Sequence, residues 1–148
     1  MRQNKINLTV VPFDNSKLIA RDIEGNGNLR LEIYNAYGPT ASNSGLDVAN
    51  FAFANEVSVT FTLSDIIFST NAADSRSASI FFANSDGSVS GNGPSITVTG
   101  EGTYTAVFAP GTAVTDVRVF VIDIVRMGDD FLWGAQTVTA TIDEIRVR

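Results

Sequence analysis

Hydrophobic and polar residues alternate along most of this chain with a period of two residues. In the segment 57–63, VSVTFTL, residues Val57, Val59, Phe61 and Leu63 fall on one side, and serine or threonine falls on the other. Such alternation places successive side chains on opposite faces of a β-strand. Similar runs predict further strands at 6–13, 29–34, 46–53, 78–83, 96–99, 103–108, 117–125 and 137–147.

The connections between these runs are rich in Gly, Asn, Ser and Pro, and no window of ten residues carries a helical stripe. Short turns fit residues 64–76, and Gly100-Glu101-Gly102 predicts a hairpin between 96–99 and 103–108. The fold class is therefore all-β: a β-sandwich or jelly roll of two antiparallel sheets. The length of 148 residues fits a single domain over 1–148.

Two of the predicted strands depart from simple alternation. Segment 117–125 is apolar on both sides, which indicates a central strand or one whose second face lines a cleft. In 137–147 the inward positions change phase between Ile142 and Ile145. A β-bulge at Asp143-Glu144 explains that change, and bulges redirect side chains.

Charge and composition exclude several functions. The net charge of −6 argues against nucleic acid, whose phosphates would repel this surface. There is no cysteine and no histidine, which excludes disulfides, a thiolate or imidazole zinc site, and a Ser-His-Asp machine. No run of about 18 apolar residues predicts a membrane span, and the first residues, MRQNKINLTVV, lack the apolar core of a signal peptide.

The only tryptophan, Trp133, lies in the polar segment 126–136, RMGDDFLWGAQ. Because Val, Ile and Phe suffice for the core, a flat ring in a loop suggests a ligand platform, and sugar rings are the usual soluble partner. The alternative is a ring that plugs one end of the sandwich. The segment also supplies candidate hydrogen-bonding groups for sugar hydroxyls, although the two aspartates also suit a solvated turn: Arg126, Asp129, Asp130 and Gln136.

A second group of candidates follows the strand at 29–34. Tyr34 is expected to point outward beside Arg30 and Glu32, with Asn35 and Tyr37 next to it in the loop. Tyr34 and Tyr37 suit sugar stacking, and they equally suit a lid on the sandwich edge. Segment 84–95 is Gly/Ser/Asn-rich. It contains no phosphate-binding glycine motif, and no predicted helix follows it.

The succession LRLEIYNAYG, VSVTFTL, ITVTGEGTYTAVF, VRVFVIDIV and ATIDEIRV resembles the β-jelly-roll carbohydrate-binding modules of bacterial plant-polysaccharide hydrolases. The resemblance spans nearly the whole chain and rests on strand pattern. It implies a non-catalytic module that binds a β-linked glucan, xylan or mannan, outside the cell and attached to a glycoside hydrolase. The chain departs from richer members in having one Trp and none in IFFANSDGS.

The same resemblance implies a structural Ca²⁺ near the closing strand, with Asp143 as a ligand. Asp14 and Glu24 are candidate partners if the first and last strands meet, because Ca²⁺ takes hard oxygen ligands. The alternative is that Asp143 and Glu144 are exposed charges on the last strand.

Two other classes of function stay open. A jelly-roll glucanase needs carboxylates patterned roughly E-x-D-x-E, whereas VFVIDIV offers only Asp123 and TIDEIRV has its two carboxylates adjacent. A lyase using Tyr34 and Arg30 is a weaker enzymatic alternative, and the sequence favours a protein that is not an enzyme. A structural or adhesive β-domain of a bacterial surface or appendage is the third class.

Overall fold

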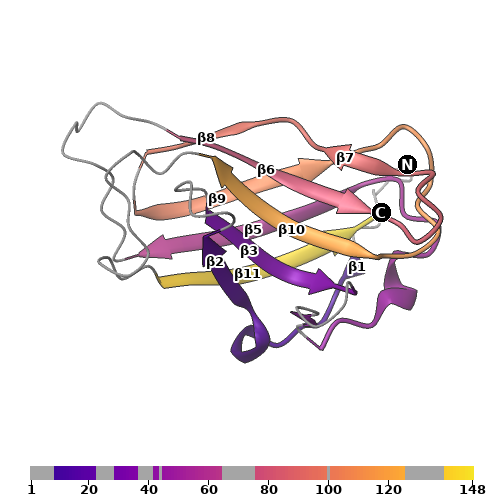
Figure 1. The fold of residues 1–148 in the computed structure, drawn as a ribbon, viewed down its shortest axis with the longest axis horizontal. Helices are drawn as coiled ribbons and strands as arrows, with labels where there is room; N and C mark the ends of the chain where they lie inside the picture. Colours follow the sequence, from indigo (N-terminus) through magenta and orange to yellow (C-terminus); the bar gives the residue numbers. More distant parts are fainter. Residues whose placement is uncertain are drawn as a thin grey trace, which may run out of the picture.

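Two antiparallel sheets pack together in the computed structural model of the chain, which describes residues 9–22, 29–36, 42–43, 45–64, 76–99, 101–125 and 139–148 (Figure 1). The smaller sheet has the strand order β1-β11-β5-β9. The larger has the order β2-β3-β10-β6-β7, with β4 beside β3 and β8 beside β6. The all-β sandwich expected from the alternating pattern is confirmed.

The elements follow one another in the order β1 (Thr9–Val10), η1 (Asn15–Lys17), β2 (Ile19–Asp22), β3 (Leu29–Asn35), β4 (Ser42–Asn43), η3 (Val48–Phe51), β5 (Val57–Ser64), β6 (Arg76–Ala83), β7 (Ser90–Asn92), β8 (Ile96–Val98), β9 (Gly102–Phe108), β10 (Val119–Val125) and β11 (Thr139–Val147). The two η elements are single turns of 3₁₀-helix. Within the described ranges, no helix has the length and apolar character to span a bilayer.

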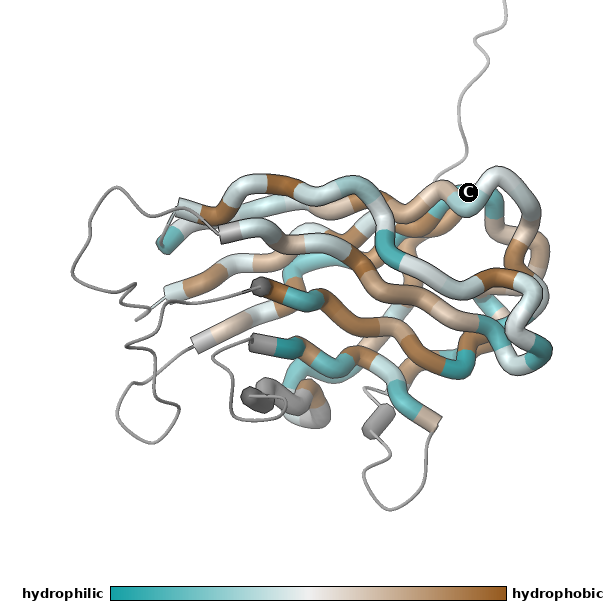
Figure 2. Tube along the Cα trace, turned by 45° about the horizontal axis from the view of Figure 1, so that its top comes forward, coloured by the Kyte–Doolittle hydropathy of each residue, from teal (hydrophilic) through white to brown (hydrophobic). Residues whose placement is uncertain are grey.

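The core lies between the two sheets and takes alternate residues from each. In β5 the burial alternates residue by residue, so that Val59 and Phe61 are fully buried while the threonines face out. Hydrophobic and hydrophilic positions alternate along the strands in the same way in Figure 2. The alternation of apolar side chains therefore fixes which face of each strand turns inward.

Four phenylalanines from four elements form an aromatic cluster at one end of the core. Phe82 of β6 stacks on Phe108 of β9 across the two sheets, with ring centroids 5.5 Å apart. Phe120 of β10 lies 5.7 Å from Phe82, and Phe51 of η3 lies 5.6 Å from Phe120. These contacts join both sheets and η3 into one packed unit.

The predicted central strand is confirmed, because β10 pairs with β3 on one side and with β6 on the other. Its second face carries a small apolar cluster of Val119, Val121 and Ala83, with Phe81 packed against it. Val121 is 0% exposed and the adjacent Glu32 is 3% exposed. Among the described residues this sheet face is thus largely covered, which disfavours it as a platform for a polysaccharide chain.

The predicted bulge in the last strand is also confirmed. The register between β11 and β5 shifts between Ile142 and Glu144, which leaves Asp143 as the extra residue. Asp143 is exposed and accepts a hydrogen bond of 2.6 Å from the Thr62 hydroxyl. Glu144 instead forms an ion pair with Arg146.

The prediction of a strand at 46–53 is wrong. Asp47 caps the short helix η3 by accepting a hydrogen bond from the backbone N–H of Ala49. The helical turn then buries Phe51, and Phe53 is left on the surface. The two phenylalanines have strand spacing in the sequence, and the capping aspartate outweighs it.

The predicted hairpin at residues 100–102 is wrong as well. Strand β8 pairs with β6 in the larger sheet, whereas β9 pairs with β5 in the smaller one. The chain therefore crosses between sheets at this turn. The alternating pattern did not predict the short strands β4 and β7.

Asn15 completes the edge of the last strand, where β1 is too short to reach. Beyond the pairing of β1 with β11, the Asn15 side chain accepts from the Ile142 N–H at 3.0 Å and donates to the Ile142 carbonyl at 2.9 Å. The Asn15 amide thus makes the two hydrogen bonds to Ile142 that the backbone of a longer neighbouring strand would make.

We expect Asn15→Ala to lower the free energy of unfolding by about 1–3 kcal/mol, because it leaves both backbone groups of Ile142 without these partners. Asn15→Asp keeps the acceptor and loses the donor, so it should fall between alanine and wild type. Urea denaturation measures both; equal stability of Asn15→Ala and wild type would show that water satisfies this edge.

Candidate functional site

The sandwich has two ends, which we name after residues that mark them. At the Phe53 end, β5 begins at Val57, β9 ends at Phe108 and β10 begins at Val119. At the Val125 end, β10 finishes and β11 begins at Thr139. Backbone bonds from Phe53 to Val114 tie the loops of the Phe53 end together.

The alternating pattern predicts that Tyr34 points outward beside Arg30, and this prediction is wrong. The register between β3 and β10 shifts because β3 carries an extra residue, Ile33. After this bulge Tyr34 packs against the main core. Asn35 is only 9% exposed, and its amide donates to the carboxylate of Glu32 at 3.3 Å. Tyr34 is thus half-buried and Asn35 is buried, and their role in sugar binding stays a prediction.

The segment that carries Trp133, together with Arg126, Asp129, Asp130 and Gln136, lies outside the described residues, as does Tyr37. It starts after Val125, whereas Asn35 pairs with Val119 at the other end of β10. The two groups of predicted sugar-binding residues are therefore anchored at opposite ends of the sandwich. Their contacts with a sugar stay a prediction.

Phe53 is the most exposed large hydrophobic side chain among the described residues, at 79%. Its backbone adopts φ 64°, a left-handed conformation that is costly for a bulky residue. The Phe53 N–H donates to the Val114 carbonyl at 2.8 Å, and the Val114 N–H donates to the Ala54 carbonyl at 2.8 Å. This backbone clamp holds an aromatic ring in solvent, which is typical of strain retained at a binding site.

A network of aspartates stiffens the neighbouring loops at the same end. The Ser85 N–H donates to Asp116 at 2.9 Å, and these hydrogen bonds from Ser85 lower the pKa of Asp116 below its ordinary value of 3.8. Hydrogen bonds from Ser88 lower the pKa of Asp86 in the same way. The carboxylate of Asp116 thus joins the loop after β6 to the loop before β10, and that of Asp86 holds the first loop internally.

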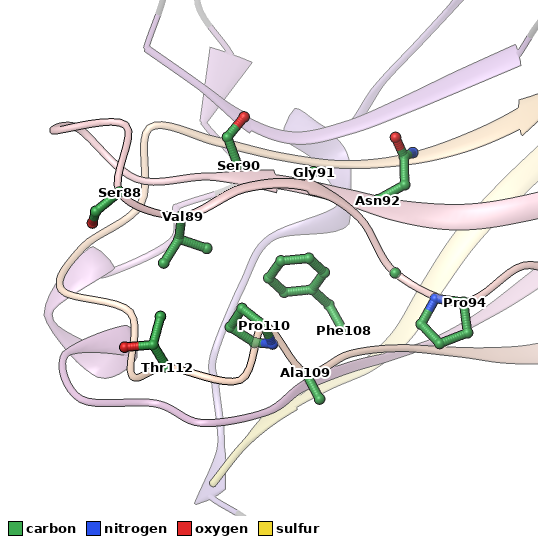
Figure 3. Close-up of a pocket in the computed structure, with 11 residues that line it drawn as sticks. Ser88, Val89, Ser90, Gly91, Asn92, Pro94, Phe108, Ala109, Pro110 and Thr112 are labelled. Atoms are coloured by element: carbon green, nitrogen blue, oxygen red, sulfur yellow. The ribbon is translucent and has the colours of Figure 1, made fainter.

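A pocket of about 360 Å³ opens at the Phe53 end, between the edge strands β7 and β9 (Figure 3). It is lined by residues 88–94 and 108–110 and by Thr112. In Figure 3 Val89 points toward Pro110 and the ring of Phe108, while Ser90 and Asn92 point to the opposite side of β7. Its volume falls within the range of about 300–1,000 Å³ that is usual for small-molecule sites.

The walls of this pocket combine apolar and polar groups without charge. Phe108 and Val89 are buried, and the rings of Pro94 and Pro110 flank them. Ser88 and Thr112 are exposed lining residues that carry hydroxyl groups and form a polar rim, and the Ser88 hydroxyl accepts a hydrogen bond from the Asn84 amide at 2.9 Å. No lining residue is charged, so the pocket suits a neutral ligand with both an apolar face and hydroxyl groups.

The first and last strands do meet, as the calcium hypothesis requires, because β1 pairs with β11. Asp14, however, accepts from the Ser16 N–H and hydroxyl, and Asp143 accepts from Thr62. Glu24 lies outside the described residues. The described residues contain no group of three or more carboxylate, histidine or cysteine side chains that could hold a metal; calcium binding stays a prediction.

Arg30 and Asp123 face each other across β3 and β10 with two contacts, of 2.7 and 3.2 Å. The carboxylate of Asp123 is thus held by a guanidinium in a bidentate ion pair. Tyr34 packs against the core, on the opposite face of the sheet from Arg30. The pair considered for a lyase is therefore separated by the sheet.

Sequence reasoning missed both Phe53 and the pocket. Phe53 had a weak signal, because the run NFAFAN follows a capping Asp47. The pocket also had a weak signal in the sequence. In the run SGNGPS at residues 90–95, two glycines leave a strand edge without side chains.

Comparison of this chain with protein-family models, with curated proteins and with solved structures gave no match. Its function is therefore argued from its own residues.

Replacing Phe53 tests the strain at this position. Glycine adopts a positive φ without steric cost, so Phe53→Gly should be more stable than Phe53→Ala by about 1 kcal/mol. The free energy of unfolding in urea measures the difference. If alanine is the more stable of the two, the left-handed backbone at Phe53 is not strained.

The carboxylate network predicts a pH dependence. Because the pKa of Asp116 is lower in the folded protein, its charge stabilises the fold above about pH 4, and this contribution is lost as the pH falls through the folded value. Asp116→Asn should lower the thermal midpoint by a few degrees at pH 7, and this difference should shrink as the pH falls below about 4 and through the lowered pKa of Asp116 in the folded protein. Glu101→Gln controls for net charge; a pH-independent difference would contradict the assignment.

Proposed function

We propose that this chain is a non-catalytic carbohydrate-binding module that recognises a β-linked polysaccharide such as a glucan, xylan or mannan. The observation that carries the proposal is the uncharged pocket between β7 and β9. A pyranose ring is neutral, with apolar C–H faces and a rim of hydroxyl groups. The apolar rings of Phe108, Pro94 and Pro110 match its faces, and the polar rim matches its hydroxyls.

The exposed ring of Phe53 also supports the proposal, because Phe53 is bonded to the loop that contributes Thr112 to the pocket. The Val114 backbone clamps Phe53, and Thr112, two residues earlier, lines the pocket. A chain that leaves the pocket along this loop meets a preorganised aromatic ring, which costs little entropy to use. Such a module would be secreted and attached to a polysaccharide hydrolase, in keeping with the resemblance of its strand pattern.

Affinity electrophoresis through gels containing β-glucan, xylan or mannan tests the proposal. The wild type should be retarded by at least one of them. Thr112→Trp should abolish retardation by filling the pocket, whereas Thr97→Trp, an exposed change on β8, should not. Phe53→Ala should weaken binding about 2- to 12-fold, the contribution expected of one stacked ring.

The same experiment separates this site from the segment that carries Trp133. Since Trp133 is the only tryptophan, wild-type fluorescence reports on its surroundings alone. Loss of binding in Trp133→Ala with normal binding in Thr112→Trp would move the site to the Val125 end. Absence of retardation on every glycan would refute carbohydrate binding and favour the structural or adhesive class.

A further inference from the structure

The pocket is closed at one end by direct backbone contact between the two sheets. The Gly93 N–H donates to the Ile80 carbonyl of β6 at 2.8 Å, which fixes Gly93 to the larger sheet. A Cβ on Gly93 would lie 2.3 Å from the Val107 carbonyl oxygen and 3.3 Å from the Phe108 Cα in the smaller sheet. At Gly93 the two strand edges therefore touch, and nothing passes between them.

Toward the Phe53 end the same two edges separate. Gly91, at φ 152°, has no side chain to fill the space, and no atom lies within 4 Å of its Cβ position. Phe108 and Val89 form the inner wall there, and Thr112 also lines the hollow (Figure 3). The hollow is thus a trough that is blocked at Gly93, with Gly91, Val89 and Thr112 among its other lining residues.

Strand β7 adds hydrogen-bonding groups along this trough. The Val89 carbonyl accepts from the Asn84 N–H, and the Gly93 N–H donates to the Ile80 carbonyl. Within residues 89–93, the backbone groups of the odd-numbered residues are therefore the ones that hydrogen-bond toward β6. The backbone groups of Ser90 and Asn92 therefore point away from β6, toward an edge on which the described residues place no further strand. These backbone donors and acceptors are uncharged, and they border the pocket.

From this geometry we infer that the pocket binds the terminal residue of a glycan chain and not an internal segment. The inference rests on the proposed function and specifies its ligand. A chain lying along the trough must end at Gly93, because the backbone of Val107 occupies the path of the next residue. The preceding residues would leave past Thr112, which lies two residues before the Val114 that hydrogen-bonds to the Phe53 backbone.

Calorimetric titration with two size fractions of one retarding polysaccharide tests the inference. At equal mass, the two fractions contain nearly the same total number of sugar residues, and the shorter fraction holds more chain ends. Recognition of ends predicts that binding sites per gram rise in proportion to the number of chains, with one protein bound per chain and an affinity that does not depend on chain length. Thr112→Trp should lose this binding, and Thr97→Trp should keep it.

The failures of the two proposals differ. Equal numbers of sites per gram in both fractions would overturn recognition of chain ends and leave carbohydrate binding intact. Normal titration by Thr112→Trp would overturn the assignment to this pocket. Absence of heat and of retardation with every glycan would overturn the inference together with the proposed function.

Discussion

The structure depends on the contact between Phe82 and Phe108, whose rings stack across the two sheets with centroids 5.5 Å apart. Phe82 also contacts Phe51 and Phe120, so a single side chain links β6, β9, β10 and η3. Protein interiors pack at crystal-like density, and these rings therefore fix the separation of the sheets at one end. The same cluster supplies the inner wall of the pocket through Phe108.

The cluster also determines how Phe53 is displayed. Phe51 is anchored among the buried rings, and the chain turns outward two residues later, at Phe53, before β5 begins at Val57. The left-handed backbone at Phe53 makes that turn, and the bonds with Val114 hold it. One residue of a phenylalanine pair thus stabilises the fold, and the other is presented to solvent at a conformational cost.

Edge strands usually need protection, and this protein protects the edges of β7 and β9 only in part. Gly93 lets the backbones meet, which covers the edge where β8 follows. Gly91 leaves a gap beside it. Absence of side chains at two positions therefore produces both the closed and the open part of the trough, and neither residue is chemically active itself.

The alternation of apolar residues by itself determined the fold class, the inward face of β5, the central place of β10 and the bulge at Asp143, because each follows from burying apolar side chains at a period of two. The same pattern failed where a bulge, a helix cap or a crossing between sheets overrode the alternation. An extra residue at Ile33 turned Tyr34 inward, Asp47 capped a helical turn at 48–51, and the turn after β8 crossed to the other sheet. The candidate site depends on the approach of β7 to β9, and those strands belong to different sheets. Only tertiary packing brings them together, since no local pattern specifies the distance between two sheet edges.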